Sequence, residues 1–335
     1  MPAPMRLLGL AIAFLLLVAA CETQAAGIRR IRIEGSATGP LIVGAVWYPC
    51  ATSVQDAGDG NVALSGVKDC PLAGEKLPLI VMSHGRMGWF GGGHDIAAAL
   101  ADAGFVVASI DHPNDNERNH SGTDGLEVFA GRSGDIKRLV DFMLADWPDA
   151  GHIDSKRIGL FGFSVGGYTG LVVIGGAPDF RKGLPRCART DLRALPVCAQ
   201  LENGELPREA PAHDPRIKAA VIIDPWPAFL LPADHLSGVT IPIQLWSSDP
   251  AHESDGVSGC CAAMIRDGLA SKPEWHLVEN ANHFAFLAVC SPKLALDAPR
   301  ICATPSGFDR AAFHERFQPE MIAFFRRTLN EARDH

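Results

Sequence analysis

A serine between two glycines could act as a nucleophile in this chain. Ser164 lies in the segment Gly162-Phe163-Ser164-Val165-Gly166, which fits the pattern G-x-S-x-G. The apolar stretch before it predicts a strand and the stretch after it predicts a helix. At such a strand–turn–helix junction the serine hydroxyl is exposed, and the glycines relieve backbone crowding. We therefore predict that Ser164 is a nucleophile rather than an ordinary serine of a glycine-rich loop.

A serine hydroxyl needs a base that removes its proton. His283 follows the last predicted strand, in "VENANHFAFL", at the sheet edge where Ser164 is also expected. Three other histidines have ordinary places in predicted elements: His94 begins a helix, His276 lies within a strand, and His314 belongs to the C-terminal helix. The sequence therefore predicts His283 as the general base.

The base in turn requires a carboxylate that fixes its tautomer and stabilises its charge. Two aspartates end predicted strands between the serine and the histidine. Asp224 closes "AAVIID" and Asp249 follows "IPIQLWSS". Both keep the chain order Ser…Asp…His, so position along the chain leaves the choice between them open.

An oxyanion formed from the attacked carbonyl needs backbone N–H donors. One donor is expected to be the amide that follows the nucleophile, which is Val165. The second is expected in the loop after the strand "LPLIVMS", where Arg86 follows His84 and Gly85. We interpret His84 as a residue that shapes this loop rather than as a base.

The elements that would position these residues alternate between strands and helices. Such alternation predicts a single α/β domain at residues 27–335, with about eight strands in a mostly parallel sheet flanked by helices. The strands are expected within 28–35, 41–49, 77–85, 105–112, 157–164, 217–224, 241–248 and 274–283, and the helices within 95–104, 133–144 (with Ser133 as its cap), 165–175 and 309–330.

Two stretches interrupt the alternation. Residues 50–76 read as a polar, glycine-rich loop. Residues 177–215 are rich in Pro and Arg, carry Cys187 and Cys198, and form an insertion after the predicted helix that follows the serine. This insertion could overhang the site as a small lid, or it could be a surface loop clipped by a disulfide, and the residues favour neither.

The N-terminus, residues 1–26, is expected to be an export signal. The apolar run Leu7–Ala20 fits the core of a signal peptide and is short for a membrane span. It ends in "VAAC", which resembles a bacterial lipobox and predicts acylation at Cys21. Plain secretion, with cleavage after Ala25 or Ala26, is the alternative. Both readings place the mature protein outside the cytoplasm, as a periplasmic or membrane-anchored lipoprotein or as a secreted protein.

The cysteine count agrees with export. Eight cysteines remain when Cys21 is set aside, and an even number in an exported chain indicates disulfides, with buried free thiols as the alternative. No C-x-x-C spacing points to zinc. The simplest pairing joins near neighbours in the sequence: Cys50–Cys70, Cys187–Cys198 and Cys290–Cys302.

Composition excludes some classes of partner. The chain has 335 residues, of which 47% are hydrophobic and 20% are charged, as expected for a globular protein with a sizeable core. The formal net charge is −8 and no basic stripe is present, which argues against a nucleic-acid partner.

Several segments together resemble one branch of the α/β-hydrolases, the platelet-activating-factor acetylhydrolase and dienelactone-hydrolase-like branch. The resemblance implies esterase activity without a metal or an organic cofactor, and oxyanion donors at the amides of Arg86 and Val165. Dienelactone hydrolases use cysteine as the nucleophile, whereas this chain has Ser164. The matching segments lie between about Leu77 and Leu287 and are "LPLIVMSHGRMG", "DIAAALADAGFVVASIDHP", "RIGLFGFSVGGYTG", "AAVIIDPW" and "NANHFAFL".

The same resemblance favours one acid. In the acetylhydrolases the acid follows the sixth strand in a D-x-W setting, which Asp224-Pro225-Trp226 matches. Many other relatives place it after the seventh strand, a few residues before a proline, and "SSDPAHESDG" around Asp249 departs from that pattern. Asp224 is therefore the preferred acid and Asp249 the alternative.

These observations together predict an exported serine hydrolase that cleaves a carboxylic ester through an acyl-enzyme. The expected substrate is a small-molecule or lipid ester with a short or accessible acyl group, and membrane contact is expected only through an N-terminal lipid anchor. Two alternatives remain: an amidase or peptidase with the same Ser164, Asp224 and His283, and a catalytically silent hydrolase fold that serves as a binding protein.

Overall fold

The computed structural model describes residues 26–37, 39–51, 64–188, 193–252 and 261–331. The expected signal peptide, with Cys21, lies outside the described residues except for Ala26. Residues 52–63 of the loop expected at 50–76 also lie outside them.

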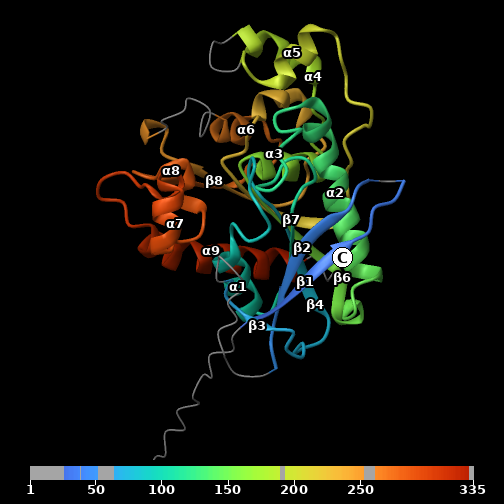
Figure 1. Ribbon diagram of the computed structural model, residues 1–335, viewed down its shortest axis with the longest axis vertical. Helices are drawn as coiled ribbons and strands as arrows, with labels where there is room; N and C mark the ends of the chain where they lie inside the picture. The colour runs from blue at the N-terminus through green and yellow to red at the C-terminus, as the bar shows by residue number, and fades with distance from the viewer. Residues whose placement is uncertain (1–25, 38, 52–63, 189–192, 253–260, 332–335) are drawn as a thin grey trace, which may run out of the picture.

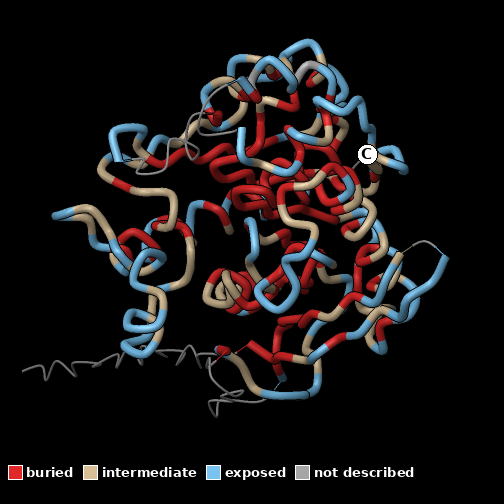
Figure 2. The backbone as a smooth tube through the Cα atoms, turned by 45° about the horizontal axis from the view of Figure 1, so that its top comes forward, coloured by how far each residue is buried: buried red, intermediate tan, exposed pale blue. Residues whose placement is uncertain are grey.

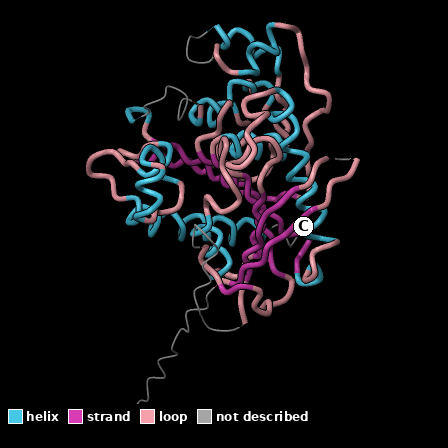
Figure 3. Tube along the Cα trace, viewed as in Figure 1, coloured by secondary structure: helices cyan, strands magenta, loops and turns pink. Residues whose placement is uncertain are grey.

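A twisted sheet forms the centre of the molecule (Figure 1, Figure 3). It joins nine strands in the order β3-β1-β2-β5-β4-β6-β7-β8-β9. The strands are β1 (Gly27–Ile33), β2 (Ile42–Tyr48), β3 (Val67–Lys68), β4 (Leu77–Ser83), β5 (Val106–Ile110), β6 (Ile153–Phe163), β7 (Ile217–Ile223), β8 (Ile243–Ser248) and β9 (Glu274–Val278).

The prediction of a mostly parallel sheet is confirmed. The strands from β5 to β9 pair in parallel, whereas β2 pairs antiparallel with both β1 and β5. All eight expected strands are present. The additional β3 is only two residues long and pairs with β1, too short to leave a pattern in the sequence. The chain therefore has an α/β-hydrolase fold.

Helices cover both faces of the sheet (Figure 1). One face packs against α2, α3 and α6, and the other packs against α1 and α9, whereas α5 packs on α2. The helices are α1 (His94–Asp102), α2 (Leu126–Ala145), α3 (Val165–Val173), α4 (Phe180–Gly183), α5 (Pro196–Glu202), α6 (Ala262–Gly268), α7 (Pro292–Asp297), α8 (Pro299–Cys302) and α9 (Arg310–Glu331). Short 3-10 turns include η2 (Leu184–Ala188) and η6 (His283–Phe286).

The central strands are buried on both faces, and this burial explains their continuous apolar runs. In β4, Leu79 and Val81 point into the core under α2 and α3, whereas Ile80 and Met82 point toward α1 and α9. The buried part of the chain is concentrated along the sheet and the exposed part in the outer loops (Figure 2). The carboxyl ends of these strands are thus packed from both sides.

The expected start of α2 at Ser133 is wrong, because the helix begins seven residues earlier, at Leu126. The Ser133 hydroxyl donates to the Ala130 carbonyl at 3.0 Å and accepts from the Ala212 amide at 2.8 Å. The Leu126 amide at the true helix start donates to Gln200 Oε1 at 2.9 Å. A side chain distant in the sequence therefore satisfies this helix terminus.

The expected insertion at 177–215 contains α4, η2 and α5 within its described residues. It packs against the N-terminal end of α2, where the Val197 amide donates to the Asp124 carbonyl at 2.9 Å. The three expected disulfides, Cys50–Cys70, Cys187–Cys198 and Cys290–Cys302, are confirmed, and one of them lies within this insertion. None of the helices in the described ranges combines the length and the apolar character of a bilayer-spanning segment.

Candidate active site

Ser164 lies at the turn between β6 and α3 in a strained backbone conformation. Its φ of 57° and ψ of −120° are unfavourable for a residue with a side chain, and such strain is typical of functional sites. The Ser164 amide donates to the Ile223 carbonyl at 2.9 Å, and its carbonyl accepts from the Trp226 amide at 3.1 Å. The hydroxyl does not cap α3. The surrounding structure therefore holds the strained turn, and the hydroxyl takes no part in capping the helix.

The two glycines of the motif allow this turn because other backbone lies against them. A Cβ on Gly162 would overlap the carbonyl group of Gly166, and a Cβ on Gly166 would overlap the carbonyl oxygen of Ser83 at the end of β4. The motif therefore needs glycine at both positions, because β4, β6 and α3 approach one another closely at this point.

Gly166→Ala is expected to lower the free energy of unfolding by about 3 kcal/mol or more, because backbone atoms would have to move. The matched control is Gly131→Ala in α2, where a Cβ would meet nothing within 4 Å. That change should stabilise the protein by about 0.5–1 kcal/mol. Denaturant unfolding of both variants measures the two effects, and equal stability of the two would contradict the packing argument.

His283 and Asp224 are hydrogen-bonded. Nδ1 of His283 lies 3.0 Å from Oδ2 of Asp224, and the Asp224 side chain is fully buried. Asp224 directly follows β7 with a φ of 41°, and His283 begins η6 after β9. The His283 ring also stacks on Phe163, with ring centroids 4.7 Å apart, and Phe163 immediately precedes Ser164. The structure therefore brings all three residues to the same edge of the sheet.

Ser248 completes the hydrogen bonds of the Asp224 carboxylate. Its amide donates to Oδ1 at 2.8 Å and its hydroxyl donates to Oδ2 at 2.6 Å. These two hydrogen bonds fix the plane of the carboxylate toward His283. Sequence reasoning did not identify Ser248, because its role depends on the parallel pairing of β7 with β8.

Asp249, the alternative acid, has different partners. Its carboxylate accepts from the amides of Ala251 and Asn280, at 3.0 and 2.9 Å, and these bonds lower the pKa of the Asp249 carboxyl. It is partly exposed and makes no hydrogen bond to His283. Asp249 therefore braces the loops after β8 and β9.

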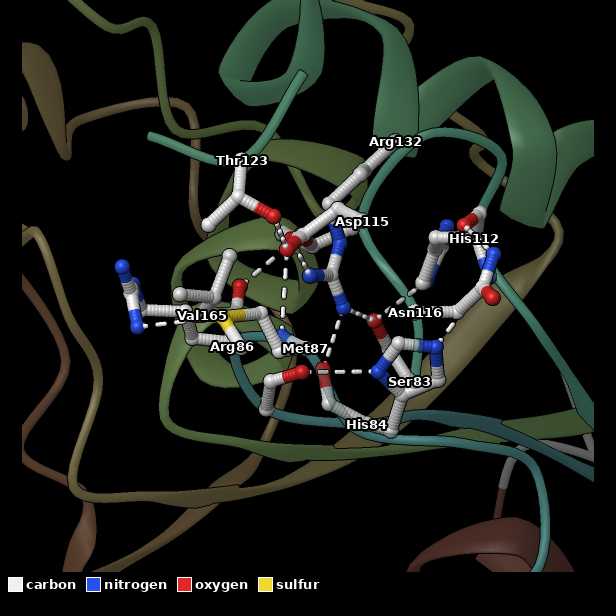
Figure 4. A network of polar contacts seen from close by, with 12 residues as sticks. Ser83, His84, Arg86, Met87, His112, Asp115, Asn116, Thr123, Arg132 and Val165 are labelled. Carbon is white, nitrogen blue, oxygen red and sulfur yellow. Dashed lines mark hydrogen bonds and ion pairs between the residues drawn. The ribbon is translucent and has the colours of Figure 1, made fainter. Parts of the chain in front are cut away.

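The two expected oxyanion donors are the amides of Arg86 and Val165, which Figure 4 shows near each other. Gly85, directly before Arg86, lies against the Ser164 side chain. Neither amide donates a hydrogen bond to any residue that the structure describes. The carbonyl of the Gly85–Arg86 peptide accepts from the Gly88 amide at 3.1 Å and from Nδ1 of His84 at 2.7 Å. Because C=O and N–H point in opposite directions across a trans peptide, these bonds also fix the direction of the Arg86 N–H.

His84 shapes this loop as a neutral imidazole. Its Nδ1 must carry a proton to donate to Gly85, and its Nε2 accepts from the His112 amide at 3.1 Å. Burial, and then the positive charge of Arg132, lower the pKa of His84 to about 3. Both ring nitrogens are thus committed to the loop backbone, as the sequence-based interpretation of His84 expects.

Asp111, at the end of β5, provides a test of the electrostatics near the site. Its carboxylate accepts from the Phe90 amide at 2.7 Å, and burial raises its pKa to about 6 from the ordinary 3.8. A raised carboxyl pKa means that the folded state binds more protons than the unfolded state between these two values. The contribution of Asp111 to the free energy of unfolding is therefore lost as pH rises from about 4 to about 6.

We expect Asp111→Asn to remove this dependence, because the amide oxygen can still accept from Phe90 and does not ionise. Between about pH 4.5 and pH 8 the wild-type protein should lose about 2 kcal/mol more stability than the variant. Denaturant unfolding at both pH values measures the difference. Parallel pH dependence in the two proteins would show that Asp111 titrates normally.

Among the described residues no cluster of three or more His, Cys, Asp or Glu side chains has the arrangement of a metal site.

A mostly parallel sheet with an elbow serine after β6 and a histidine after the last strand is the arrangement of the α/β-hydrolase fold. The structure of a ferulic acid esterase from Streptomyces cinnamoneus is similar to this chain, with a TM-score of 0.63 and 17% sequence identity. The similarity covers 93% of this chain and 92% of that one, and at this identity it shows the shared fold. No family model and no curated protein matches the chain.

Proposed function

We propose that this protein is a serine hydrolase that cleaves carboxylic esters through an acyl-enzyme. The observation that carries the proposal is the hydrogen bond of 3.0 Å between His283 and the buried Asp224, beside the strained turn at Ser164. A hydrolase-fold esterase as structural neighbour supports the reaction class. The segments that resemble the acetylhydrolase branch support the assignment to a short-acyl esterase.

The Asp224 carboxylate determines which nitrogen of His283 can act as a base. An ionised carboxylate accepts hydrogen bonds only, so Nδ1 of His283 carries the proton and Nε2 has the free lone pair. The same carboxylate stabilises the imidazolium that forms when Nε2 is protonated. In this proposal Asp224 orients the base and does not itself take up the proton.

Acylation begins when Ser164 Oγ attacks the ester carbonyl carbon and its proton moves to His283 Nε2. The carbonyl electron pair moves onto the oxygen, which the amides of Arg86 and Val165 stabilise. When this pair returns, the bond to the alcohol oxygen breaks and Nε2–H protonates the leaving alcohol. The product of this half-reaction is the acyl ester of Ser164.

Deacylation repeats these steps with water. His283 Nε2 takes a proton from water as its oxygen attacks the acyl carbon, and the same two amides hold the second oxyanion. Breakdown of this intermediate releases the carboxylic acid, and Nε2 returns its proton to Ser164 Oγ. The sum of the two half-reactions is ester plus water giving acid plus alcohol, so no cofactor is required.

The substrate class within the proposal is an ester with a short or otherwise accessible acyl group, such as a phospholipid acetyl ester or a polyester. The test is a panel of p-nitrophenyl esters of increasing acyl length, with matched anilides and a feruloyl ester. Turnover that falls with acyl length and is absent for anilides is the expected result. Faster cleavage of the anilides would favour an amidase, and no turnover of any member would favour a binding protein.

Export belongs to the same proposal, with acylation at Cys21 as its preferred form. The "VAAC" ending of the apolar run supports it. Cys21→Ser is expected to release the protein from the membrane fraction or to block its processing. Mass spectrometry of the mature N-terminus gives the deciding readout, since a chain that begins at Ala26 or Gly27 would show plain secretion instead.

A further inference from the structure

A buried ion pair lies behind residues 84–88, the loop after β4 that carries the Arg86 amide, where α2 passes the ends of β4 and β5 (Figure 4). Nη1 of Arg132 is 2.6 Å from Oδ2 of Asp115, and both side chains are only 1% exposed. Neither residue belongs to the proposed catalytic machinery of Ser164, Asp224 and His283. The pair therefore needs another explanation.

Each partner of the pair holds the backbone on one side of Arg86. Nη2 of Arg132 donates to the carbonyl of His84, two residues before Arg86. Oδ1 of Asp115 accepts from the amide of Met87, one residue after Arg86, at 3.1 Å. The peptide that carries the Arg86 N–H is thus fixed from both ends by a single ion pair.

The pair is itself held in one geometry by neighbouring hydroxyls. Thr123 Oγ1 donates to Asp115 Oδ1 at 2.7 Å, and Nη2 of Arg132 reaches Ser83 Oγ at 3.3 Å. Ser83 Oγ also lies 2.9 Å from Nε2 of His112. These contacts tie the ion pair to residues 83–87 and to Thr123. The pair therefore has one fixed geometry, which a preorganised oxyanion site requires.

Stability alone does not account for this pair. Two charges removed from water lose hydration that their mutual attraction only partly restores, and an apolar pair of similar volume is often as stable. Burial lowers the pKa of the Arg132 guanidinium, which reflects this cost. What an apolar pair could not provide is one donor for the His84 carbonyl and one acceptor for the Met87 amide.

Residues 84–87 also pack against the turn at Ser164. Gly166 packs so closely on the Ser83 and His84 carbonyls that it has no room for a side chain. Gly85 also lies near the nucleophile, since a Cβ there would be 3.2 Å from Ser164 Cβ. A displacement of the loop would therefore change the distance between the Arg86 and Val165 amides.

We propose that Asp115 and Arg132 are positioning residues that hold the Arg86 amide where the oxyanion forms. The inference rests on the proposed function, since it assigns these residues a part in the same reaction. They touch no substrate atom, and they act only through the backbone of residues 84–87.

The test compares two double variants in which the buried charges are removed together. Asp115→Ala with Arg132→Met removes both backbone contacts, whereas Asp115→Asn with Arg132→Met keeps an oxygen that can accept from the Met87 amide. We expect kcat on a p-nitrophenyl ester to fall about 10²–10³-fold in the first variant, the effect of losing one oxyanion donor. The second variant should lose less. KM should stay within about threefold in both, because the lost interaction is made only in the transition state.

An aryl boronic acid provides a readout that a purely structural role would not change. Its tetrahedral adduct on a serine places an oxygen where the oxyanion forms, so its inhibition constant should rise with the loss in kcat/KM. The control is Asp149→Ala with Arg29→Met, which removes a partly buried ion pair of the same 2.6 Å length away from the site. This control should lower the melting temperature and leave kcat unchanged.

The outcomes separate the inference from the function on which it rests. If the wild-type protein turns over esters and both folded variants keep kcat within about threefold, the positioning role is wrong. The positioning role is also wrong if the variants lose only thermal stability, as the control does. If the Ala–Met variant does not fold, the Asn–Met variant decides by the same criterion. Absence of ester turnover in the wild-type protein would overturn the proposed function, and the inference with it.

Discussion

Asp224→Asn is expected to lower kcat by about 10⁴-fold, or roughly 5 kcal/mol of activation free energy. Asn has nearly the same size as Asp, but it has no charge to stabilise the imidazolium of His283. Its amide nitrogen can also donate to Nδ1, which would leave the proton on Nε2 and block the base. Turnover at saturating substrate measures the loss, and a thermal melt confirms that the variant is folded.

Asp249→Asn is the matched control, because Asp249 follows the neighbouring strand and has the same side chain. Its carboxylate accepts from the Ala251 and Asn280 amides, and an Asn oxygen can replace only part of these contacts. We expect a modest loss of stability and kcat near the wild-type value. A large loss of kcat in Asp249→Asn beside a near-normal Asp224→Asn would reverse the assignment of the acid.

Ser164→Ala is expected to remove nearly all turnover, by about 10⁶-fold in kcat, the effect of deleting the nucleophile in a serine protease. The hydroxyl makes no cap bond to α3, so its loss should change stability little. Steady-state kinetics at enzyme concentrations high enough to detect residual activity measures the effect.

The control for this variant is Ser155→Ala, at an exposed position near the other end of β6. It should leave both turnover and stability unchanged. Retention of most of the activity in Ser164→Ala would mean that another residue is the nucleophile. The strained turn would then need another explanation.

The centre of the sheet could be predicted from the sequence because its strands are buried on both faces. Runs such as Leu77–Ser83 and Ile217–Ile223 leave few polar positions, so their extent is visible without any tertiary information. The turn at Ser164 could be predicted for a related reason. A side chain at Gly162 or Gly166 would prevent the close backbone contacts of this turn, so glycine is required at both positions. The requirement is visible in the sequence as the pattern G-x-S-x-G.

The choice between Asp224 and Asp249 depends on information that the residues alone do not contain. Both aspartates end adjacent parallel strands, and only the three-dimensional arrangement shows which one faces His283. The resemblance to the acetylhydrolases favours Asp224, which is the residue that the structure brings to 3.0 Å from the ring.

The residues that hold the surrounding loops and helix ends in place could not be predicted, because their hydrogen-bond partners are distant in the sequence. Arg132 acts on the carbonyl of His84, 48 residues away, and Gln200 satisfies the start of α2 from 74 residues away. Within their own segments these residues look like ordinary polar positions of a helix. The same limitation explains why the sequence suggested Ser133 as a cap, since the true helix start has no local capping residue.

The most direct test of the central claim is the reaction of the wild-type protein with a fluorophosphonate, followed by peptide mass spectrometry. An activated serine attacks phosphorus and displaces fluoride, so we expect one phosphonyl group per chain, on Ser164. Labelling should be lost in Ser164→Ala and strongly slowed in Asp224→Asn. A protein that hydrolyses esters but carries the label on another residue, or carries none, would contradict the assignment of Ser164 as the nucleophile.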